Sequence, residues 1–315
     1  MRRPAPGPGP IPPAGGGQPR GGGARSPVPG RPGRAPVRRS GRAGGELSRW
    51  ARIGRGTARV SLLSALVVSG VGQAPGLART APPTCWTPGV VSHRGYWAGG
   101  TENTARAFEQ ALAAGSGRVE LDVRFTEDHQ PVLMHDATVD RTTSGTGRVS
   151  GMTLARFREL RTADGQRPPT LAEVLELLRG GAEEVLVELK EVPDAEDLRS
   201  LEDDYDRSGA HRWASLMSFS PSALEAVRSI PARKGLLSTT APPLSLAGKF
   251  SFVGVRYDNL SGALTREYRD HGMAVYAWTP DDESAWRRLA GYGVDRVITN
   301  ETSAYLAWAR EACQP

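Results

Sequence analysis

Several residue types that carry out acid–base and phosphate chemistry stand in short groups beside apolar runs of the sequence. His93 and Arg94 follow one such run, and His135 follows another. Glu120 and Asp122 are two residues apart in a third run, so both side chains point to the same face of a strand. Two acids on one face of an apolar strand are costly unless a cation or hydrogen-bond donors pair them. The spacing therefore indicates a polar site built at strand ends.

A fourth group completes the set of candidate functional residues. Glu188 and Lys190 are also two apart, at the end of the apolar run VLVEL, and so share a face. Three carboxylates with no thiolate offer oxygen ligands, which favour a hard cation such as Ca²⁺ or Mg²⁺ over zinc. Two imidazoles suit general acid and base work near neutral pH. Arg94 and Lys190 suit a phosphate anion, and the set as a whole indicates cleavage of a phosphate ester.

The elements that must position these residues alternate between short apolar strands and amphipathic helices. Residues 85–315 are enough for a single α/β domain of the (β/α)8 barrel (TIM barrel) type, in which site residues stand at the carboxyl ends of the strands. Nine strand candidates exceed the eight of a barrel, so one is interpreted as a hairpin extension. The strand candidates are Val90–His93, Arg118–Phe125, Val132–Met134, Val185–Leu189, Ala214–Phe219, Gly235–Leu237, Phe252–Val255, Ala274–Ala277 and Arg296–Ile298.

Local signals refine this expectation. A turn at Glu127–Gln130 would make a hairpin that places Asp122 opposite His135 and so gathers both with Glu120. The helix patterns are Thr104–Ala114, Leu171–Arg179, Asp197–Arg207, Pro221–Arg228 and Asp281–Ala290, with Asn103, Thr170 and Ser220 as expected N-caps. Of the remaining histidines, the sequence places His129 in a turn, His211 on the surface and His271 at a helix C-cap.

The ordered motifs resemble those of the glycerophosphodiester phosphodiesterase family over nearly all of residues 90–311. The matching residues are His93-Arg94-Gly95, Glu102-Asn103-Thr104, Glu120-x-Asp122, His135-Asp136, Asp140-Arg141-Thr142-Thr143, Glu188-x-Lys190, Trp278-Thr279 and Gly293-Val294-Asp295. The resemblance implies a divalent metal held by Glu120, Asp122 and Glu188, with His93 and His135 as the acid–base pair. It also implies that Arg94 and Lys190 bind the phosphate and that Glu102 orients a neighbouring group. Trp278 either floors the substrate pocket or packs the barrel top, and the sequence leaves both open.

Two positions depart from that family pattern. Thr101 stands where the family often has proline, and Thr299-Asn300 stands where it usually has Thr-Asp. Neither position is a proposed metal ligand, so we expect these departures to tune the site without abolishing it.

The N-terminal part of the chain differs in composition from the rest. Residues 1–44 are rich in Pro, Gly and Arg and are expected to be disordered. Residues 45–84 combine an arginine-rich stretch, an apolar run of about a dozen residues and a small-residue exit, a pattern typical of a secretory signal peptide and its linker. An alternative is a buried or amphipathic helix. The signal pattern predicts a secreted protein, and the run is too short for a membrane span, so no stable membrane anchor is expected.

The charge distribution argues against nucleic acid as a partner. Residues 1–84 contain 14 Arg, no Lys and one acid, a net charge of +13, while the whole chain carries +6, so residues 85–315 carry −7. An acidic domain is poorly suited to gripping phosphates along a nucleic acid.

The two cysteines lie at the ends of the expected domain. Cys85 precedes the first strand and Cys313 follows the last helix, and in a barrel of this type both positions fall on the bottom face. A disulfide between them is compatible with export, and two unpaired thiols are the alternative.

Three functions are compatible with this sequence. The first is hydrolysis of a small-molecule glycerophosphodiester to sn-glycerol 3-phosphate and an alcohol. The second is a lysophospholipase D activity on a lysophospholipid, for which residues 241–248 would supply a mobile apolar loop near the mouth. The third is a barrel that binds without catalysis, a reading that the complete set of acids and imidazoles disfavours.

Overall fold

Eight parallel strands close into a barrel in the computed structural model, which describes residues 86–313. They are β1 (Gly89–Ser92), β2 (Arg118–Phe125), β4 (Glu184–Leu189), β5 (Ala214–Ser218), β6 (Lys234–Ser238), β7 (Phe252–Arg256), β8 (Ala274–Trp278) and β9 (Arg296–Thr299). β1 pairs with both β9 and β2, and these two pairings close the barrel. The ninth strand, β3 (Pro131–Leu133), is antiparallel to β2. The TIM-barrel prediction and the hairpin extension are both confirmed.

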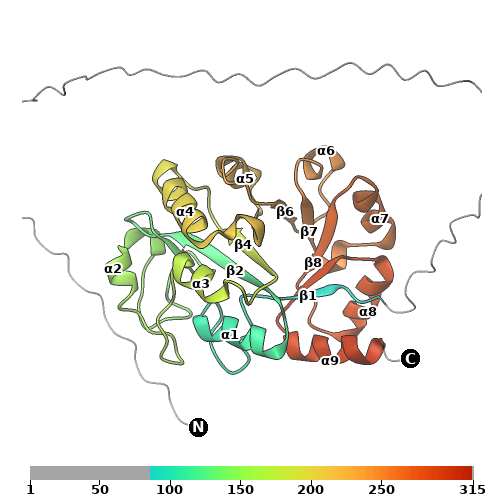
Figure 1. Ribbon diagram of the computed structural model, residues 1–315, viewed down its shortest axis with the longest axis horizontal. Helices are drawn as coiled ribbons and strands as arrows, with labels where there is room; N and C mark the ends of the chain where they lie inside the picture. Colours follow the sequence, from blue (N-terminus) through green and yellow to red (C-terminus); the bar gives the residue numbers. More distant parts are fainter. Residues whose placement is uncertain (1–85, 314–315) are drawn as a thin grey trace, which may run out of the picture. The chain divides into compact units, whose positions relative to one another are not determined.

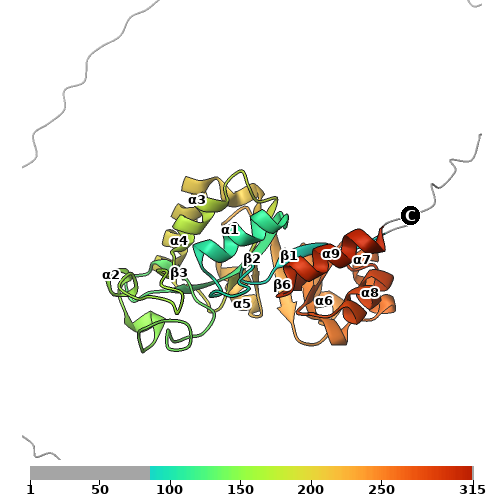
Figure 2. The ribbon, with the colours of Figure 1, turned by 90° about the horizontal axis from the view of Figure 1, so that it is seen from below.

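Helices surround the strands on the outside of the barrel (Figure 1). The longer ones are α1 (Ala105–Ala114), α3 (Leu171–Leu178), α4 (Ala195–Ser208), α5 (Pro221–Ala226), α7 (Gly262–Asp270), α8 (Glu283–Tyr292) and α9 (Thr302–Ala312), and the single turns are α2 (Leu154–Phe157) and α6 (Leu244–Ala247). Figure 2 shows α1, α3 and α4 on one flank and α7, α8 and α9 on the other, with β1 between them. Each flank packs its own apolar cluster against the strands, and a smaller cluster lies between β3, α2 and the segment that joins them.

The helix starts follow the expected capping rules with one exception. Thr170 caps α3 in a complete capping box and Ser220 caps α5, as predicted. The prediction of Asn103 as a cap is wrong, because Thr104 caps α1 and accepts from the Ala107 amide. Asn103 adopts a left-handed conformation with φ 54°, and its side chain is bound to Asp122 instead.

The β2–β3 hairpin differs from the expected register by one residue. Val123 pairs with Leu133, and the Met134 amide donates to the Asp122 carbonyl at 3.1 Å, so Asp122 stands opposite Met134 and not His135. The turn holds five residues, 126–130, because the Thr126 hydroxyl accepts from the Gln130 amide at 2.9 Å and draws Thr126 out of the strand. His135 therefore reaches the site from the segment that follows β3.

The barrel interior is closed at its lower end by a buried carboxylate. Glu184, the first residue of β4, accepts from Arg233, from Arg296 and from the Tyr276 hydroxyl, at 3.1–3.3 Å. Arg233 precedes β6, Arg296 begins β9 and Tyr276 lies within β8, so one side chain ties together several strands around the barrel.

Neutralising this carboxylate is expected to destabilise the barrel without affecting the opposite end. Glu184→Gln removes the charge that pairs with Arg233, Arg296 and, at 3.9 Å, Arg118, which we expect to cost about 2–3 kcal/mol of unfolding free energy. For a domain of this size, that lowers Tm by about 5–10 °C in a calorimetric scan. Glu176→Gln, which removes an exposed i,i+3 ion pair with Arg179, is the matched control and should leave Tm nearly unchanged. Equal shifts for the two variants would contradict this role of Glu184.

Other sequence predictions fall outside the described residues. The leader (1–44), the signal region (45–84) and Cys85 all lie there. Cys313, just after α9, is not a free thiol, but its pairing with Cys85 stays a prediction. Within residues 86–313, no helix is long and apolar enough to cross a membrane.

Candidate active site

A cavity of about 160 Å³ opens at the carboxyl ends of the strands, where a barrel of this type places its site. Its polar side comes from β2, from the ends of β1 and β4 and from the segment after β3, and its apolar side comes from β5, β6, β8 and β9. The lining residues are His93, Arg94, Glu120, His135, Glu188, Lys190, Met217, Phe219, Leu237, Trp278, Thr279 and Ile298. Except for Asp122, which lies beneath it, and Glu102, every predicted site residue lines this one cavity.

Three buried carboxylates converge on the polar side. Asp122 on β2 and Glu188 on β4 are register partners, and oxygens of Glu120, Asp122 and Glu188 lie within 4.8 Å of one another. Burial, together with the Asp122 charge, raises the pKa of Glu120 well above its usual range and that of Glu188 to about 7. Burial acts in the same direction on Asp122, but Lys190 and Arg94 outweigh it and lower the pKa of that carboxyl.

This cluster fits a divalent cation. Glu120 Oε1 and Asp122 Oδ1 are buried, and within residues 86–313 neither finds a hydrogen-bond partner. Among the described residues, Glu120 Oε1 is unpaired and Asp122 Oδ1 has only an ion pair with Lys190, at 3.4 Å. Such oxygens beside a third carboxylate are energetically unfavourable unless a further cation balances their charge. The donors are all oxygen, the set that hard cations prefer.

The two imidazoles are held by different kinds of partner. His93 Nδ1 lies 2.7 Å from Asn300 Oδ1, whose amide nitrogen donates to Asp281 at 2.7 Å. Because Asp281 fixes the Asn300 amide, Oδ1 faces His93 and His93 Nδ1 must be the donor. The departure from Thr-Asp to Thr299-Asn300 therefore does touch a proposed catalytic residue. Burial, with a contribution from Arg94, lowers the pKa of His93 to about 4.

His135 has a carboxylate as its partner. Its Nδ1 lies 2.8 Å from Asp136 Oδ1, and Arg124 donates to its backbone carbonyl at 2.9 and 3.1 Å. Burial lowers the pKa of His135, while Asp122 and Asp136 oppose that effect. Both ring orientation and backbone position are thus fixed by neighbouring side chains.

Arg94 and Lys190, the two candidate phosphate-binding side chains, each form ion pairs with carboxylates of the site. Arg94 has φ 58°, and its backbone amide donates to Glu120 while its guanidinium contacts Glu102 at 2.8 Å and Asp122 at 3.3 Å. The ammonium of Lys190 lies 2.7 Å from Glu188 and 3.4 Å from Asp122. Charges of both signs therefore alternate across the floor of the cavity.

Aromatic side chains shape the opposite wall. Trp278, at the end of β8, donates from Nε1 to the Gly254 carbonyl at 3.2 Å and meets Phe219 edge to face at 5.3 Å. Phe219 is 45 % exposed, a high value for a large apolar side chain. Trp278 thus lines the cavity and also packs on the barrel top.

The sequence predicted Asn103 to be a helix cap and indicated no role for it in the site. The Asn103 amide donates to Asp122 Oδ2 at 2.7 Å and its oxygen accepts from the Asp122 amide at 3.1 Å, so it orients that carboxylate from behind. A positive φ at an asparagine that follows a glutamate is not readable from residue types alone.

Removal of the Asn103 amide is expected to weaken metal binding. Asn103→Gly preserves the left-handed backbone and removes both hydrogen bonds, and loss of such an orienting partner typically costs 10–100-fold in affinity, so we expect a loss of about that size. Calorimetric titration with Mn²⁺ measures it. Asn259→Ala, which removes an exposed amide that is bonded to the Thr239 carbonyl and not to any of the three acids, is the control. Unchanged Mn²⁺ affinity in Asn103→Gly would show that Asp122 needs no orienting amide.

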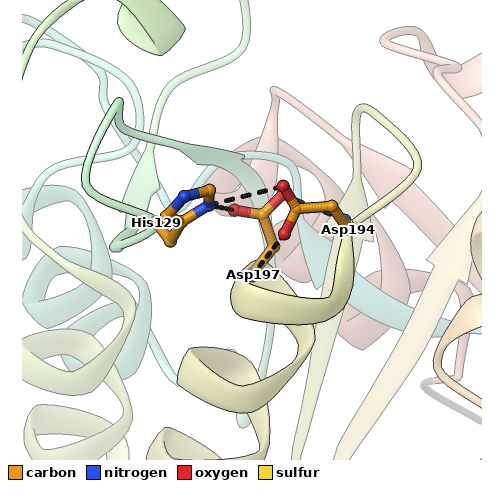
Figure 3. A group of neighbouring side chains, drawn as sticks. All are labelled: His129, Asp194 and Asp197. Carbon is orange, nitrogen blue, oxygen red and sulfur yellow. Dashed lines mark hydrogen bonds and ion pairs between the residues drawn. The ribbon is translucent and has the colours of Figure 1, made fainter.

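A second group with metal-ligand geometry lies away from the cavity. His129, in the β2–β3 turn, contacts Asp197 at 2.9 Å and Asp194 at 3.5 Å at the start of α4 (Figure 3). It also contacts Glu196 of the same helix at 2.9 Å. Asp194 and Asp197 already cap that helix in a reciprocal capping box. The hydrogen bond that His129 donates to Asp197 is the main cause that raises the pKa of His129, so ion pairing with α4 accounts for this arrangement. His129 occupies a turn as predicted, and its ring forms ion pairs with the acidic residues at the start of α4.

A parallel barrel with buried carboxylates and two imidazoles at the strand ends defines a phosphoric diester hydrolase site, and the comparisons with known proteins agree. The glycerophosphoryl diester phosphodiesterase family model matches residues 93–304. A glycerophosphodiester phosphodiesterase of Caldanaerobacter subterraneus is 30 % identical over 241 residues, which cover 70 % of this chain and 98 % of that protein. The chain belongs to the glycerophosphoryl diester phosphodiesterase family.

Solved structures show the same fold. A glycerophosphodiester phosphodiesterase of Agrobacterium tumefaciens is 29 % identical with a TM-score of 0.64, covering 71 % of this chain and 99 % of that one. A phosphodiesterase of Oleispira antarctica, described in complex with the product sn-glycerol-3-phosphate, is 23 % identical with a TM-score of 0.64, covering 71 % and 97 %. The second likeness concerns the fold alone.

Proposed function

We propose that this protein hydrolyses glycerophosphodiesters to sn-glycerol 3-phosphate and an alcohol, with one divalent cation, Ca²⁺ or Mg²⁺, at Glu120, Asp122 and Glu188. The observation that carries the proposal is the convergence of three buried carboxylates in one cavity lined by His93 and His135. When bound, the cation would neutralise phosphate charge and stabilise charge that develops on its oxygens. Family membership supports the substrate class.

The side chains of this chain divide the remaining work. Arg94 presents a planar guanidinium, and Lys190 a point charge, on the same side of the cavity, and both suit the phosphate oxygens. Trp278 and Phe219 form an apolar wall on the opposite side of the cavity, and apolar surroundings strengthen such charge interactions.

The hydrogen-bond partners of the two rings suggest which is the acid and which is the base. His93 donates from Nδ1 to a neutral amide, so its Nε2 carries a lone pair that accepts the proton of the attacking oxygen. His135 is backed by the Asp136 carboxylate, which stabilises an imidazolium that protonates the leaving alcohol. The roles are distinguished by a p-nitrophenyl phosphodiester, whose leaving group needs no proton. His135→Ala should retain far more activity on that substrate than His93→Ala, and the reverse order would invert the assignment.

The activity itself is tested by a coupled assay for glycerol 3-phosphate on the full chain. Glycerophosphocholine, glycerophosphoethanolamine and glycerophosphoglycerol are offered in turn, first with EDTA and then with Ca²⁺, Mg²⁺ or Mn²⁺ restored. We expect turnover that chelation abolishes and a divalent cation restores. No glycerol 3-phosphate under any of these conditions would leave a binding barrel as the better account.

A lysophospholipase D activity is a second candidate, favoured by the apolar wall. Met217, Phe219, Leu237 and Trp278 offer a surface that suits a lipid substrate better than a small polar alcohol. The segment 241–248, expected as a mobile loop at the mouth, instead contains α6 and is anchored by the Tyr268 hydroxyl on the Pro242 carbonyl, so it does not contribute. Release of choline from lysophosphatidylcholine at a rate comparable to that from glycerophosphocholine would favour this candidate.

Export is proposed from the sequence pattern of residues 45–84 alone. Mass spectrometry of the N-terminus of protein recovered from culture medium tests it. An uncleaved chain confined to the cells would contradict it.

A further inference from the structure

Arg141, in the segment after His135, joins two carboxylates that belong to different parts of the site. Its Nη2 and Nη1 donate to Glu102 at 2.7 and 3.1 Å, and its Nε donates to Asp136 at 2.6 Å. The side chain is 49 % exposed and does not line the cavity, so it does not reach the reacting centre itself.

Each of those carboxylates also holds one of the residues proposed to act on substrate. Asp136 contacts His135 Nδ1 through Oδ1 at 2.8 Å, and Glu102 Oε1 accepts from Arg94 at 2.8 Å. The connection therefore runs from Arg94 through Glu102, Arg141 and Asp136 to His135, with alternating charge.

We propose that Arg141 is a positioning residue that sets the orientation of His135 and of Arg94 together. The inference rests on the proposed function and extends it to a residue outside the cavity. An arginine suits this place because its planar fork offers five donors in fixed directions, enough to hold both carboxylates in one geometry. Lysine has a single ammonium and cannot reproduce the fork.

The positive charge of Arg141 also supports a positioning role. With Arg141 present, each carboxylate shares its charge between two partners. Without Arg141, nothing holds the Asp136 carboxylate in place, so the partner of the His135 ring is no longer fixed. The Glu102 charge then falls on Arg94 alone, and Arg94 attracts phosphate less strongly. The hydrogen bond from Arg141 is the main cause that holds the pKa of Asp136 well below its usual range.

A purely structural role for Arg141 is disfavoured by the way its loop is closed. Backbone hydrogen bonds join Val139 to Gly147 and Thr143 to Val139, and the Asp140 carboxylate accepts from the Gly147 amide. These contacts define the loop without the Arg141 side chain.

The test compares Arg141→Met and Arg141→Lys with the wild-type full chain in the glycerophosphocholine assay. We expect Arg141→Met to lose about 10–100-fold in kcat/KM, through a lower kcat and a higher KM. The kcat/KM of Arg141→Lys should lie between those of the wild type and Arg141→Met. If Arg141→Met folds poorly, the Arg141→Lys variant carries the test. Arg158→Met is the matched control, because Arg158 is 47 % exposed and pairs with a single carboxylate, Glu173, away from the site.

Two double-mutant cycles separate positioning from a general loss of structure. In an Asp136→Asn background, the kcat effect of Arg141→Met should largely vanish, and in a Glu102→Gln background the KM effect should do so. A structural defect would persist in both backgrounds.

The proposal is overturned if Arg141→Met or Arg141→Lys has the kcat/KM of the wild type. It is also overturned if, in both cycles, the loss in the double mutant is the product of the losses in the two single mutants. A wild-type chain without any turnover would instead refute the proposed function, so the two failures are distinguishable.

Discussion

Replacement of His135 by alanine is expected to lower kcat by about 10²–10⁴-fold on glycerophosphodiesters, and His93→Ala by a similar factor. Each ring lines the cavity and is oriented by a dedicated partner, Asp136 for His135 and Asn300 for His93, so removal of either leaves one proton transfer without a positioned group. Steady-state kinetics at saturating metal measure the effect.

His271→Ala is the control for these variants. His271 caps the end of α7, as the sequence predicted, and its ring contacts only the Glu267 carbonyl among the described hydrogen bonds. We expect its kcat to stay near the wild-type value. Near-wild-type turnover in His93→Ala or His135→Ala would refute the acid–base assignment.

Glu188→Gln is expected to weaken metal binding and to lower turnover by about 10³-fold, equivalent to ~4 kcal/mol of transition-state stabilisation. The substitution keeps the shape of the side chain and removes one of three convergent charges. Asp194→Asn is the matched control, since it removes a charge from the His129 group and should leave both quantities unchanged.

The same variant should change how metal binding depends on pH. A pKa of about 7 for Glu188 means that this carboxyl carries a proton at lower pH, and a cation must displace it to bind. Wild-type affinity for Mn²⁺ should therefore rise between pH 6 and pH 8, and Glu188→Gln should lose much of that rise. An equal pH dependence in the two proteins would contradict Glu188 as a ligand.

The sequence was sufficient for the barrel and for the set of residues in its cavity. All nine strands were predicted, because short apolar runs bounded by polar residues mark buried strands, and the carboxyl ends of the parallel strands in a barrel share one face. Glu188 and Lys190 illustrate this, since a period of two on a strand end was enough to place them together.

What the sequence did not show were the hydrogen bonds that orient those residues. A hydroxyl at Thr126 moved the hairpin register by one residue, and the amide of Asn103 bound Asp122 where a helix cap was expected. Asn300 was noticed as a departure, yet its contact with His93 joins residues 207 apart through loop geometry. Local patterns do not encode such contacts, because they depend on how separate loops meet over the strands.

The most direct test of the metal centre is a crystal structure of the protein soaked with Mn²⁺, with anomalous scattering used to locate the ion. We predict one peak between the carboxylates of Glu120, Asp122 and Glu188, on the side that faces His93 and His135. A peak at His129, Asp194 and Asp197 alone, or none near the three buried acids, would contradict the account.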